Sequence, residues 1–312
     1  MGQFIADTGV NTVSATIPPL PVNAMSRPVP ATKLLHTLTA AIVLALASAA
    51  SAQAANVLVV LSDADHLDLK DGKVFATGFY LNELMQPVKL LRDAGHQITF
   101  ATPTGRAPTV DRKSIDPAYF NDDAADLQAH RALLDTLALT SKDTSPVLSL
   151  SRIEQIGYDR YDAVYIPGGH APMQDLLKSP ALGRLLTDFH NKGKTTALVC
   201  HGPIALLSTL PDARGFSATM ERRSQAASVP QWIYSGYQVT VISNEEEEQA
   251  KPQLGGGEMK FYPQSALQQA GVRYSSNTAP WTANVVVDRE LITGQNPASA
   301  VGVAKELLSR LK

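Results

Sequence analysis

The sequence predicts an α/β fold with a mostly parallel β-sheet, and three observations support this. Short apolar runs rich in valine and isoleucine alternate with segments whose apolar residues recur at helical spacing. Strands that alternate with helices form βαβ units, which make the sheet parallel and cover both of its faces. No internal repeat, linker or low-complexity tract follows residue 55, so residues 56–312 are expected to form one domain.

The first half of this domain is expected to hold three strands and one clear helix. In the helix, 83–96, Leu84, Val88 and Leu91 recur at helical spacing, and Gly95 is suited to the C-terminal cap. The long polar stretch between the second and third strands is expected to be irregular, with a single helix. The three predicted strands and their turns cover residues 56–64, 97–105 and 161–170.

The second half repeats the alternation of strands and helices. Its segments have the lengths and the glycine stops that such elements need. The pair of runs at 284–294 reads as a hairpin. The expected order is a helix at 181–193, a strand at 195–200, a helix at 201–210, a strand at 237–243, the hairpin and a final helix at 299–312.

The composition narrows the class of protein. Hydrophobic residues make up 44% of the chain and charged residues 18%, as in a soluble globular protein. The formal net charge of -2 argues against a nucleic-acid partner, which would call for a basic face. One cysteine forms neither an internal disulfide nor a cysteine zinc site, and no histidine cluster has ligand spacing. We therefore expect no metal and no cofactor.

Residues 25–54 have the three parts of a secretory signal peptide. Arg27 and Lys33 give a positive start, 34–46 is mostly apolar, and 50–54 offers small-residue cleavage sites. The apolar run is shorter than the roughly 20 residues that a membrane span needs. We therefore expect a periplasmic or secreted protein that has no contact with the membrane after cleavage.

Residues 1–24 precede this signal and show no pattern, so we expect Met25 to be the true start and the first 24 positions to be an over-extended N-terminus. An exported protein lives in an oxidising compartment. A lone thiol there is either buried or kept for chemistry, which draws attention to Cys200.

Cys200 ends a predicted strand in TTALVCHGPIALL, and His201 follows it before the turn into a helix. Ligands of parallel sheets bind beyond the carboxyl ends of the strands. A sharp strand–helix turn pushes the side chain outward, and a helix N-terminus lowers the pKa of a thiol. Free cysteine is also a common buried core residue. The pattern favours a nucleophile and leaves a structural cysteine open.

Two other strand ends bear on this choice. The pair Gly168 and Gly169 closes the preceding strand, and glycines let backbone amides approach an oxyanion closely; the plainer interpretation is a tight turn. Glu83 opens the first helix at the same edge of the sheet. An acidic residue there is also favoured by the helix dipole alone.

Four motifs in order carry a family resemblance: TGFYLNELMQPVKLLRDAGHQITFATPTG, YDAVYIPGGH, ALVCHGP and LITGQNPASA. Together they resemble the ThiJ/PfpI (DJ-1/PfpI) superfamily, with its class I glutamine amidotransferase-like fold. The match is closest to the branch of chaperone-like, glutathione-independent glyoxalases III. It covers residues 56–312 and implies a flavodoxin-like sandwich with a nucleophile elbow, usually a homodimer.

The resemblance also implies roles for residues of the site. Cys200 would be the nucleophile, and Glu83 a protonated carboxyl that donates to the thiolate and lowers the thiol pKa. His201 would be the general acid and base. An acidic residue that orients this histidine falls on Glu247 by ungapped counting, with Glu246 as the alternative in the run of four glutamates.

The function expected from this resemblance is a cysteine-dependent lyase of the glyoxalase III type. It would convert 2-oxoaldehydes such as methylglyoxal to hydroxy acids, as in D-lactate dehydratase, with amides such as that of Gly169 holding the oxyanion. Two alternative functions remain open, one that uses the same site for a different reaction and one that is not enzymatic. One is a cysteine amidase or peptidase, which would also explain a hydrolase side activity; the other is a non-enzymatic holdase or oxidative-stress sensor.

Overall fold

The computed structural model describes residues 54–223 and 231–311. Nearly all of the predicted signal peptide, and the whole segment 1–24, lie outside these residues. Within the described part of the chain, no helix is both long and apolar enough to cross a membrane.

A seven-stranded sheet forms the centre of the fold, in the order β10-β11-β7-β6-β1-β4-β5. Every neighbouring pair is parallel except β10 and β11, which form the predicted hairpin. This confirms the mostly parallel α/β sheet. The strands are β1 (Asn56–Val60), β4 (Gln97–Thr102), β5 (Leu148–Ser149), β6 (Ala163–Ile166), β7 (Thr195–Val199), β10 (Val285–Asp288) and β11 (Leu291–Gly294).

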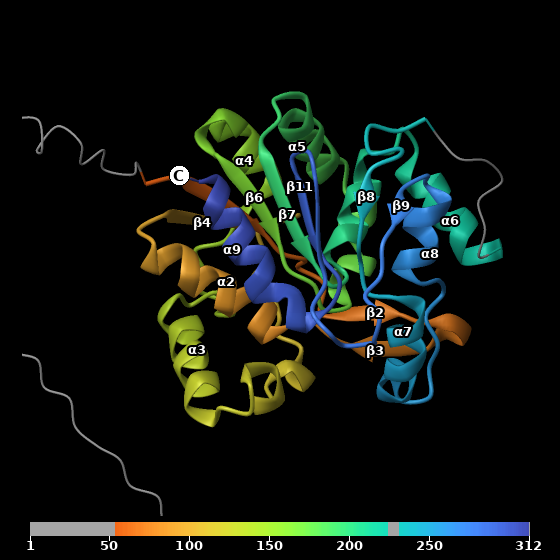
Figure 1. Ribbon diagram of the computed structural model, residues 1–312, viewed down its shortest axis with the longest axis horizontal. Coiled ribbons are helices and arrows are strands. Elements are labelled where there is room, and N and C mark those ends of the chain that lie inside the picture. Colours follow the sequence, from red (N-terminus) through yellow and green to blue (C-terminus); the bar gives the residue numbers. More distant parts are fainter. Residues whose placement is uncertain (1–53, 224–230, 312) are drawn as a thin grey trace, which may run out of the picture. The chain divides into compact units, whose positions relative to one another are not determined.

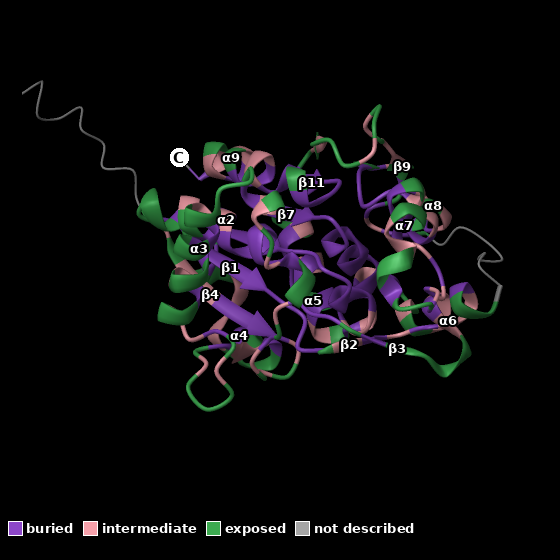
Figure 2. Ribbon diagram, turned by 90° about the horizontal axis from the view of Figure 1, so that it is seen from below, coloured by how far each residue is buried: buried purple, intermediate pink, exposed green. Residues whose placement is uncertain are grey.

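Helices cover both faces of this sheet, as Figures 1 and 2 show from two directions. Their inward faces and the central strands are buried, because runs such as Val57–Val60 have apolar neighbours on both sides. One face carries α2 (Leu81–Asp93) and α9 (Ala300–Arg310), side by side, with α3 (Ala124–Thr136) beyond α2; the other carries α4 (Leu150–Ile156), α5 (Pro180–Asn191) and the 3-10 helix η7 (Gly202–Thr209).

Smaller elements surround the end of the sheet at which the parallel strands finish. Two two-stranded sheets and three helices belong to this part, which lies on the right in Figure 1. They are β2 (His66–Asp68) with β3 (Val74–Ala76), β8 (Gln238–Val239) with β9 (Arg273–Tyr274), and α6 (Ala213–Arg223), α7 (Asn244–Ala250) and α8 (Pro263–Gln269). Among the short 3-10 helices, η1 (Lys70–Gly72) connects β2 to β3, and η8 (Lys251–Leu254) lies between α7 and α8. The others lie in the remaining connections: η2 (Arg112–Ser114), η3 (Pro117–Phe120), η4 (Tyr158–Arg160), η5 (Ala171–Met173), η6 (Leu176–Lys178) and η9 (Pro297–Ser299).

Three elements differ from the sequence-based expectation. The polar stretch 106–160 holds two α-helices, α3 and α4, and an edge strand, β5. The segment after Cys200 is a 3-10 helix whose residues are almost all buried. The strand expected at 237–243 pairs only at β8, because the amide of Thr240 donates to the side-chain hydroxyl of Thr293 (3.0 Å) and not to a neighbouring strand.

Candidate active site

Cys200 sits on a sharp turn directly after β7. Its φ angle is 59°, in the left-handed region that non-glycine residues rarely adopt. The turn is held from both sides: the Cys200 amide donates to the Gly294 carbonyl (2.9 Å), and the Cys200 carbonyl accepts from the Ile242 amide (3.1 Å). A strained residue fixed by its surroundings at a strand end is the geometry of a nucleophile elbow.

The two residues after β6, Gly168 and Gly169, lie so close to their neighbours around this turn that a side chain at either position would clash. A Cβ atom at Gly168 would lie 2.6 Å from Glu83 Oε2 and 2.7 Å from Cys200 Cβ. Gly169 has a φ angle of 85°, and a Cβ there would meet the Gly78 carbonyl oxygen. Only glycine therefore fits at these two positions, which brings the backbone against the thiol.

His201 lies between Cys200 and Glu247 and contacts both side chains. His201 Nδ1 lies 3.3 Å from Cys200 Sγ, and His201 Nε2 lies 2.9 Å from Glu247 Oε1. All three side chains are buried. A Glu247 carboxylate accepts the Nε2 proton, which leaves the Nδ1 lone pair facing the thiol. The thiol, the imidazole and the carboxylate thus have the mutual geometry that a nucleophile, a base and an orienting acid have in a catalytic triad.

Glu246, the alternative to Glu247, is occupied elsewhere. It forms a capping box with Ser243 at the start of α7 and accepts from the Trp281 amide (2.7 Å) and the Asn296 side chain (2.8 Å). Burial alone would raise the pKa of Glu246, but the hydrogen bonds, first that from Gln295, hold it below its usual value. Helical geometry turns successive side chains in different directions, so only one of the two glutamates reaches His201.

Glu83 lies beside the thiol, as the resemblance implied. It is fully buried on the first turn of α2, and its Oε2 accepts from the Gly168 amide (2.8 Å). Burial raises its pKa to about 7, although interactions with Cys200, His201 and Gly168 oppose the shift. The Gly168 amide is therefore bound to Glu83, and of the two predicted oxyanion amides it is Gly169 that faces the sulfur.

The pKa of the Cys200 thiol is raised, whereas we expected it to be lowered. Burial raises the pKa of Cys200 well above its usual value, and the neighbouring Glu83 and Glu247 add to this, while the Gly169 amide opposes it. The expected help of an exposed α-helix terminus is missing because η7 is a buried 3-10 helix. The resting site thus favours a protonated thiol, and removal of its proton depends on His201.

His170 is a site residue to which the sequence analysis assigned no role. Its ring lies 4.3 Å from the ring of His201, centroid to centroid, and its Nε2 lies 4.0 Å from Glu247 Oε2. Neither ring nitrogen has a hydrogen-bond partner among the described residues, and burial lowers its pKa well below the usual value. Its position in the PGGH motif at a strand end was the available signal.

Three side chains of this site offer ligand atoms that a metal ion could bind. Atoms of His170, His201 and Glu247 lie within 4.8 Å of one another, and two imidazoles with a carboxylate are a common donor set. No such cluster was expected, because the three residues are far apart in sequence. Binding of a metal there would remove His201 from its interaction with Glu247.

A small pocket opens onto the sulfur, and we call it the thiol pocket. Its cavity volume is about 30 Å³. Besides Cys200 and the groups around it, aromatic and apolar side chains and the amide of Gln253 form its walls. Such a pocket admits a small head group and excludes most of the water. It is lined by Tyr80, Tyr119, His170, Cys200, His201, Ile242, Glu247, Ala250, Gln253, Trp281 and Pro297.

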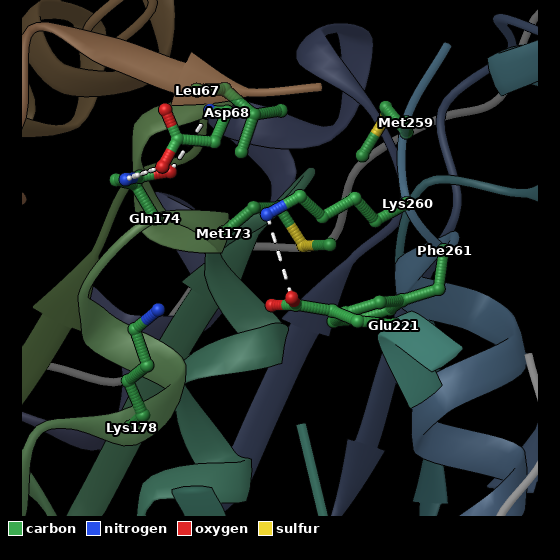
Figure 3. Close-up of a pocket in the computed structure, with 9 residues that line it drawn as sticks. All are labelled: Leu67, Asp68, Met173, Gln174, Lys178, Glu221, Met259, Lys260 and Phe261. Atoms are coloured by element: carbon green, nitrogen blue, oxygen red, sulfur yellow. Dashed lines mark hydrogen bonds and ion pairs between the residues drawn. The ribbon is translucent and has the colours of Figure 1, made fainter. Parts of the chain in front are cut away.

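Figure 3 shows another pocket of similar volume, between β2, η5 and the segment after η8. Lys260 reaches across it to Glu221 (3.4 Å), and Gln174 binds Asp68 (2.9 Å) at its edge. None of its lining residues belongs to the thiol pocket. Its described lining residues include neither a thiol nor an imidazole, so the thiol pocket is the candidate active site.

Comparisons with known proteins show what the chain is similar to. The model of the ThiJ/PfpI family-like proteins matches residues 75–261. A Schizosaccharomyces pombe protein named "Probable glutathione-independent glyoxalase hsp3103" is 28% identical over 274 residues, which cover 82% of this chain and 98% of that protein. The protein/nucleic acid deglycase HchA of Pseudomonas aeruginosa is 25% identical over 261 residues, 80% of this chain and 78% of that protein.

Solved structures show the same fold. The crystal structure of glyoxalase III from Candida albicans superposes with a TM-score of 0.56 at 20% identity, covering 83% of this chain and 98% of that one. The Francisella tularensis Rapid Encystment Protein structure gives a TM-score of 0.58 at 23% identity, covering 83% and 99%. The predicted flavodoxin-like α/β sandwich is confirmed.

Proposed function

The chain belongs to the ThiJ/PfpI-like family, and from that premise we propose that it is a cysteine-dependent lyase of the glyoxalase III type. Its substrates are 2-oxoaldehydes such as methylglyoxal, which it converts to 2-hydroxy acids without glutathione. One observation carries the proposal: the Cys200–His201–Glu247 line, with Glu83 buried against the thiol. The relatives named as glyoxalases support it.

The first step forms a bond between Cys200 Sγ and the aldehyde carbon. His201 Nδ1, 3.3 Å from the sulfur, takes the thiol proton as the bond forms. The aldehyde oxygen becomes an oxyanion, which the Gly169 amide beside the sulfur stabilises. The protonated His201 is stabilised by Glu247 at 2.9 Å. Proton transfer to the oxyanion then gives a hemithioacetal and restores neutral His201.

The second step moves hydrogen within the substrate. A base removes the proton from the former aldehyde carbon, and the electron pair forms an enediol as the ketone oxygen takes up a proton. A proton then returns to the former ketone carbon, the hydroxyl group on the sulfur-bearing carbon loses its proton, and this carbon becomes the carbonyl of a thioester with Cys200. The former aldehyde carbon is oxidised and the former ketone carbon is reduced, so no external oxidant or reductant is required. With its pKa raised to about 7, Glu83 exchanges protons near neutrality, and His201 provides the second group for this relay.

The third step releases the product. Water adds to the thioester carbonyl, the carbon–sulfur bond breaks, and the sulfur takes back a proton. The sum is one 2-oxoaldehyde plus one water giving one 2-hydroxy acid, which is lactate from methylglyoxal. The small, largely apolar thiol pocket favours this order, because it limits water until the thioester has formed.

The proposal is tested with purified protein and a Cys200→Ala variant. We expect lactate from methylglyoxal at a rate that falls by at least about 10³-fold in the variant, since nothing else in the site replaces the nucleophile. Far-ultraviolet circular dichroism checks that the variant is folded. Equal rates in the two proteins would sink the proposal. Thiol-dependent cleavage of an amide panel without lactate formation would put an amidase in its place.

We further propose that the enzyme acts after export, on the basis of the signal-peptide pattern in 25–54. Mass spectrometry of the protein from its native cell envelope tests this. A mature N-terminus close to residue 54 is expected, whereas peptides that contain Gln3 or Phe4 would contradict both the cleavage and the start at Met25.

A further inference from the structure

A second, much larger cavity adjoins the thiol pocket, and we call it the outer cavity. Its volume is about 530 Å³, against about 30 Å³ for the thiol pocket. Tyr119, Gln253, Trp281 and Pro297 line both. The outer cavity extends from this shared wall along α2 and α9, the two helices that lie side by side in Figure 1. A group bound there would be continuous with an aldehyde at Cys200.

The walls of the outer cavity are neutral and rich in amides. Four primary amide side chains line it, from Asn82, Gln86, Asn121 and Gln253. Tyr119 and Trp281 add aromatic surface, and the remaining lining residues are small and apolar. Among the residues described there, none is charged. Amides both donate and accept hydrogen bonds, so these walls match a neutral ligand that carries hydroxyl groups and a CH surface.

Asn82 is a fixed part of the wall of this cavity. Its side chain is 2% exposed, and its Nδ2 donates to the Pro297 carbonyl (3.0 Å). Its Oδ1 has no hydrogen-bond partner within the described residues. This oxygen is itself buried, so the amides that the cavity offers to a hydroxyl group are the more exposed ones of Gln86 and Asn121.

Trp281 is held at the shared wall at a cost in backbone strain. Its φ angle is 65°, which is rare for so large a residue. The Trp281 amide donates to Glu246, and its indole Nε1 donates to Gln249 Oε1 (2.6 Å), yet the residue is 41% exposed. Strain kept at an exposed aromatic residue beside a cavity indicates a fixed surface on which a ligand packs.

We propose that the outer cavity is a subsite for the hydroxylated carbon chain of sugar-derived 2-oxoaldehydes. The aldehyde head would enter the thiol pocket, while the chain would give its hydroxyl groups to the amides of Gln86 and Asn121 and pack its CH face against Trp281. This rests on the proposed glyoxalase function and adds no chemical step to it. It makes substrates longer than methylglyoxal the preferred ones, because methylglyoxal leaves the outer cavity empty.

A kinetic experiment with a filled cavity tests the subsite. Ala298 lines only the outer cavity and is exposed, so Ala298→Phe fills it from the surface; Ala132→Phe, on the exposed face of α3, is the matched control. The measured quantity is the ratio of kcat/KM for 3-deoxyglucosone to that for methylglyoxal. We expect this ratio to exceed one in the parent protein and to fall by about tenfold or more in Ala298→Phe only. A ratio unchanged within about twofold would overturn the subsite.

A binding measurement separates failure of the subsite from failure of the proposed function. Calorimetric titration of Cys200→Ala protein with 3-deoxyglucosone and with methylglyoxal needs no turnover. We expect the longer compound to bind about tenfold more tightly, and this advantage to disappear when Ala298→Phe is added. If the parent protein converts neither compound but the advantage is present, the glyoxalase function fails and the subsite stands. Equal affinities for the two compounds reject the subsite whatever the turnover.

Discussion

Two carboxyl groups near the carboxyl edge of the sheet, the fully buried Glu83 and the partly buried Asp175, have similarly raised pKa values and quite different surroundings. Burial is the main cause that raises the pKa of each to about 7. Glu83 lies against Cys200 and Gly168. Asp175 accepts from the amide of Asp63 (3.2 Å), and its Oδ1 has no partner among the described residues.

The neighbours of Asp175 provide no chemistry. Asp63, which adds to the raised pKa of Asp175, is held by the Thr104 amide (2.9 Å) and by Arg106 (3.3 Å). No thiol or imidazole is among these partners, whereas Glu83 is within the influence of both. A shifted pKa therefore marks burial, and a reactive partner is what distinguishes a catalytic group from a structural one.

Removal of the Glu83 carboxyl is expected to have the largest effect on activity in this comparison. Glu83→Gln keeps the shape and an acceptor for Gly168 but cannot exchange a proton, so kcat/KM should fall by about 10²–10³-fold. The measurement is lactate formation from methylglyoxal at pH 7. Activity within about threefold of the parent would show that Glu83 is as structural as Asp175.

Glu83→Gln should also change the dependence of stability on pH. A carboxyl whose folded pKa is raised binds its proton more tightly in the folded state, so stability falls as pH rises from the unfolded pKa of 4.5 towards about 7. The loss between pH 5 and pH 8 should be about 2 kcal/mol smaller in the variant. Urea unfolding at the two pH values measures it.

Glu247 and Glu246 can be compared in the same way, as a glutamate expected to act in catalysis and one expected to act in stability, and the expected effects are smaller. Glu247→Gln weakens the support of protonated His201 and should lower kcat by about 10²-fold with little change in Tm. Glu246→Gln disturbs the capping box and the bonds to Trp281 and Asn296, so it should lower the free energy of unfolding by about 1–3 kcal/mol. Kinetics and thermal unfolding of both variants check this, and an exchange of the two outcomes would reverse the assignment.

Asp175→Asn should leave activity almost untouched. Since its folded pKa is raised from 3.8 to about 7, the parent loses stability as pH rises through this window, and the variant should lose about 2–3 kcal/mol less between pH 5 and pH 8. The conversion of methylglyoxal should stay within about twofold. A large loss of activity with this variant would mean that the two carboxyl groups belong to one functional unit.

Much of the site was predictable because local sequence carries it. Cys200 and His201 are neighbours, and the glycine pair signals a backbone that must approach something closely. Glu247 was assigned by ungapped counting within the family resemblance, and its carboxylate contacts His201 Nε2. The raised pKa of Cys200 was not predictable, because it depends first on burial of the thiol and then on carboxyl groups from two other elements. The 3-10 form of η7 was missed since its apolar pattern also fits an α-helix.

The sequence by itself determined the α/β alternation, the strand-end position of Cys200 and the identity of its local partner His201, because periodicity and turn residues act over short distances. Only the tertiary structure decided that Glu83 and Glu247 meet the thiol and its histidine while Asp175 and Glu246 do not. It alone placed Asn82, Trp281 and Ala298 around one cavity, from segments far apart in the chain. Burial, unpaired acceptors and shifted pKa values arise from packing between such segments, and no local pattern of residues contains that information.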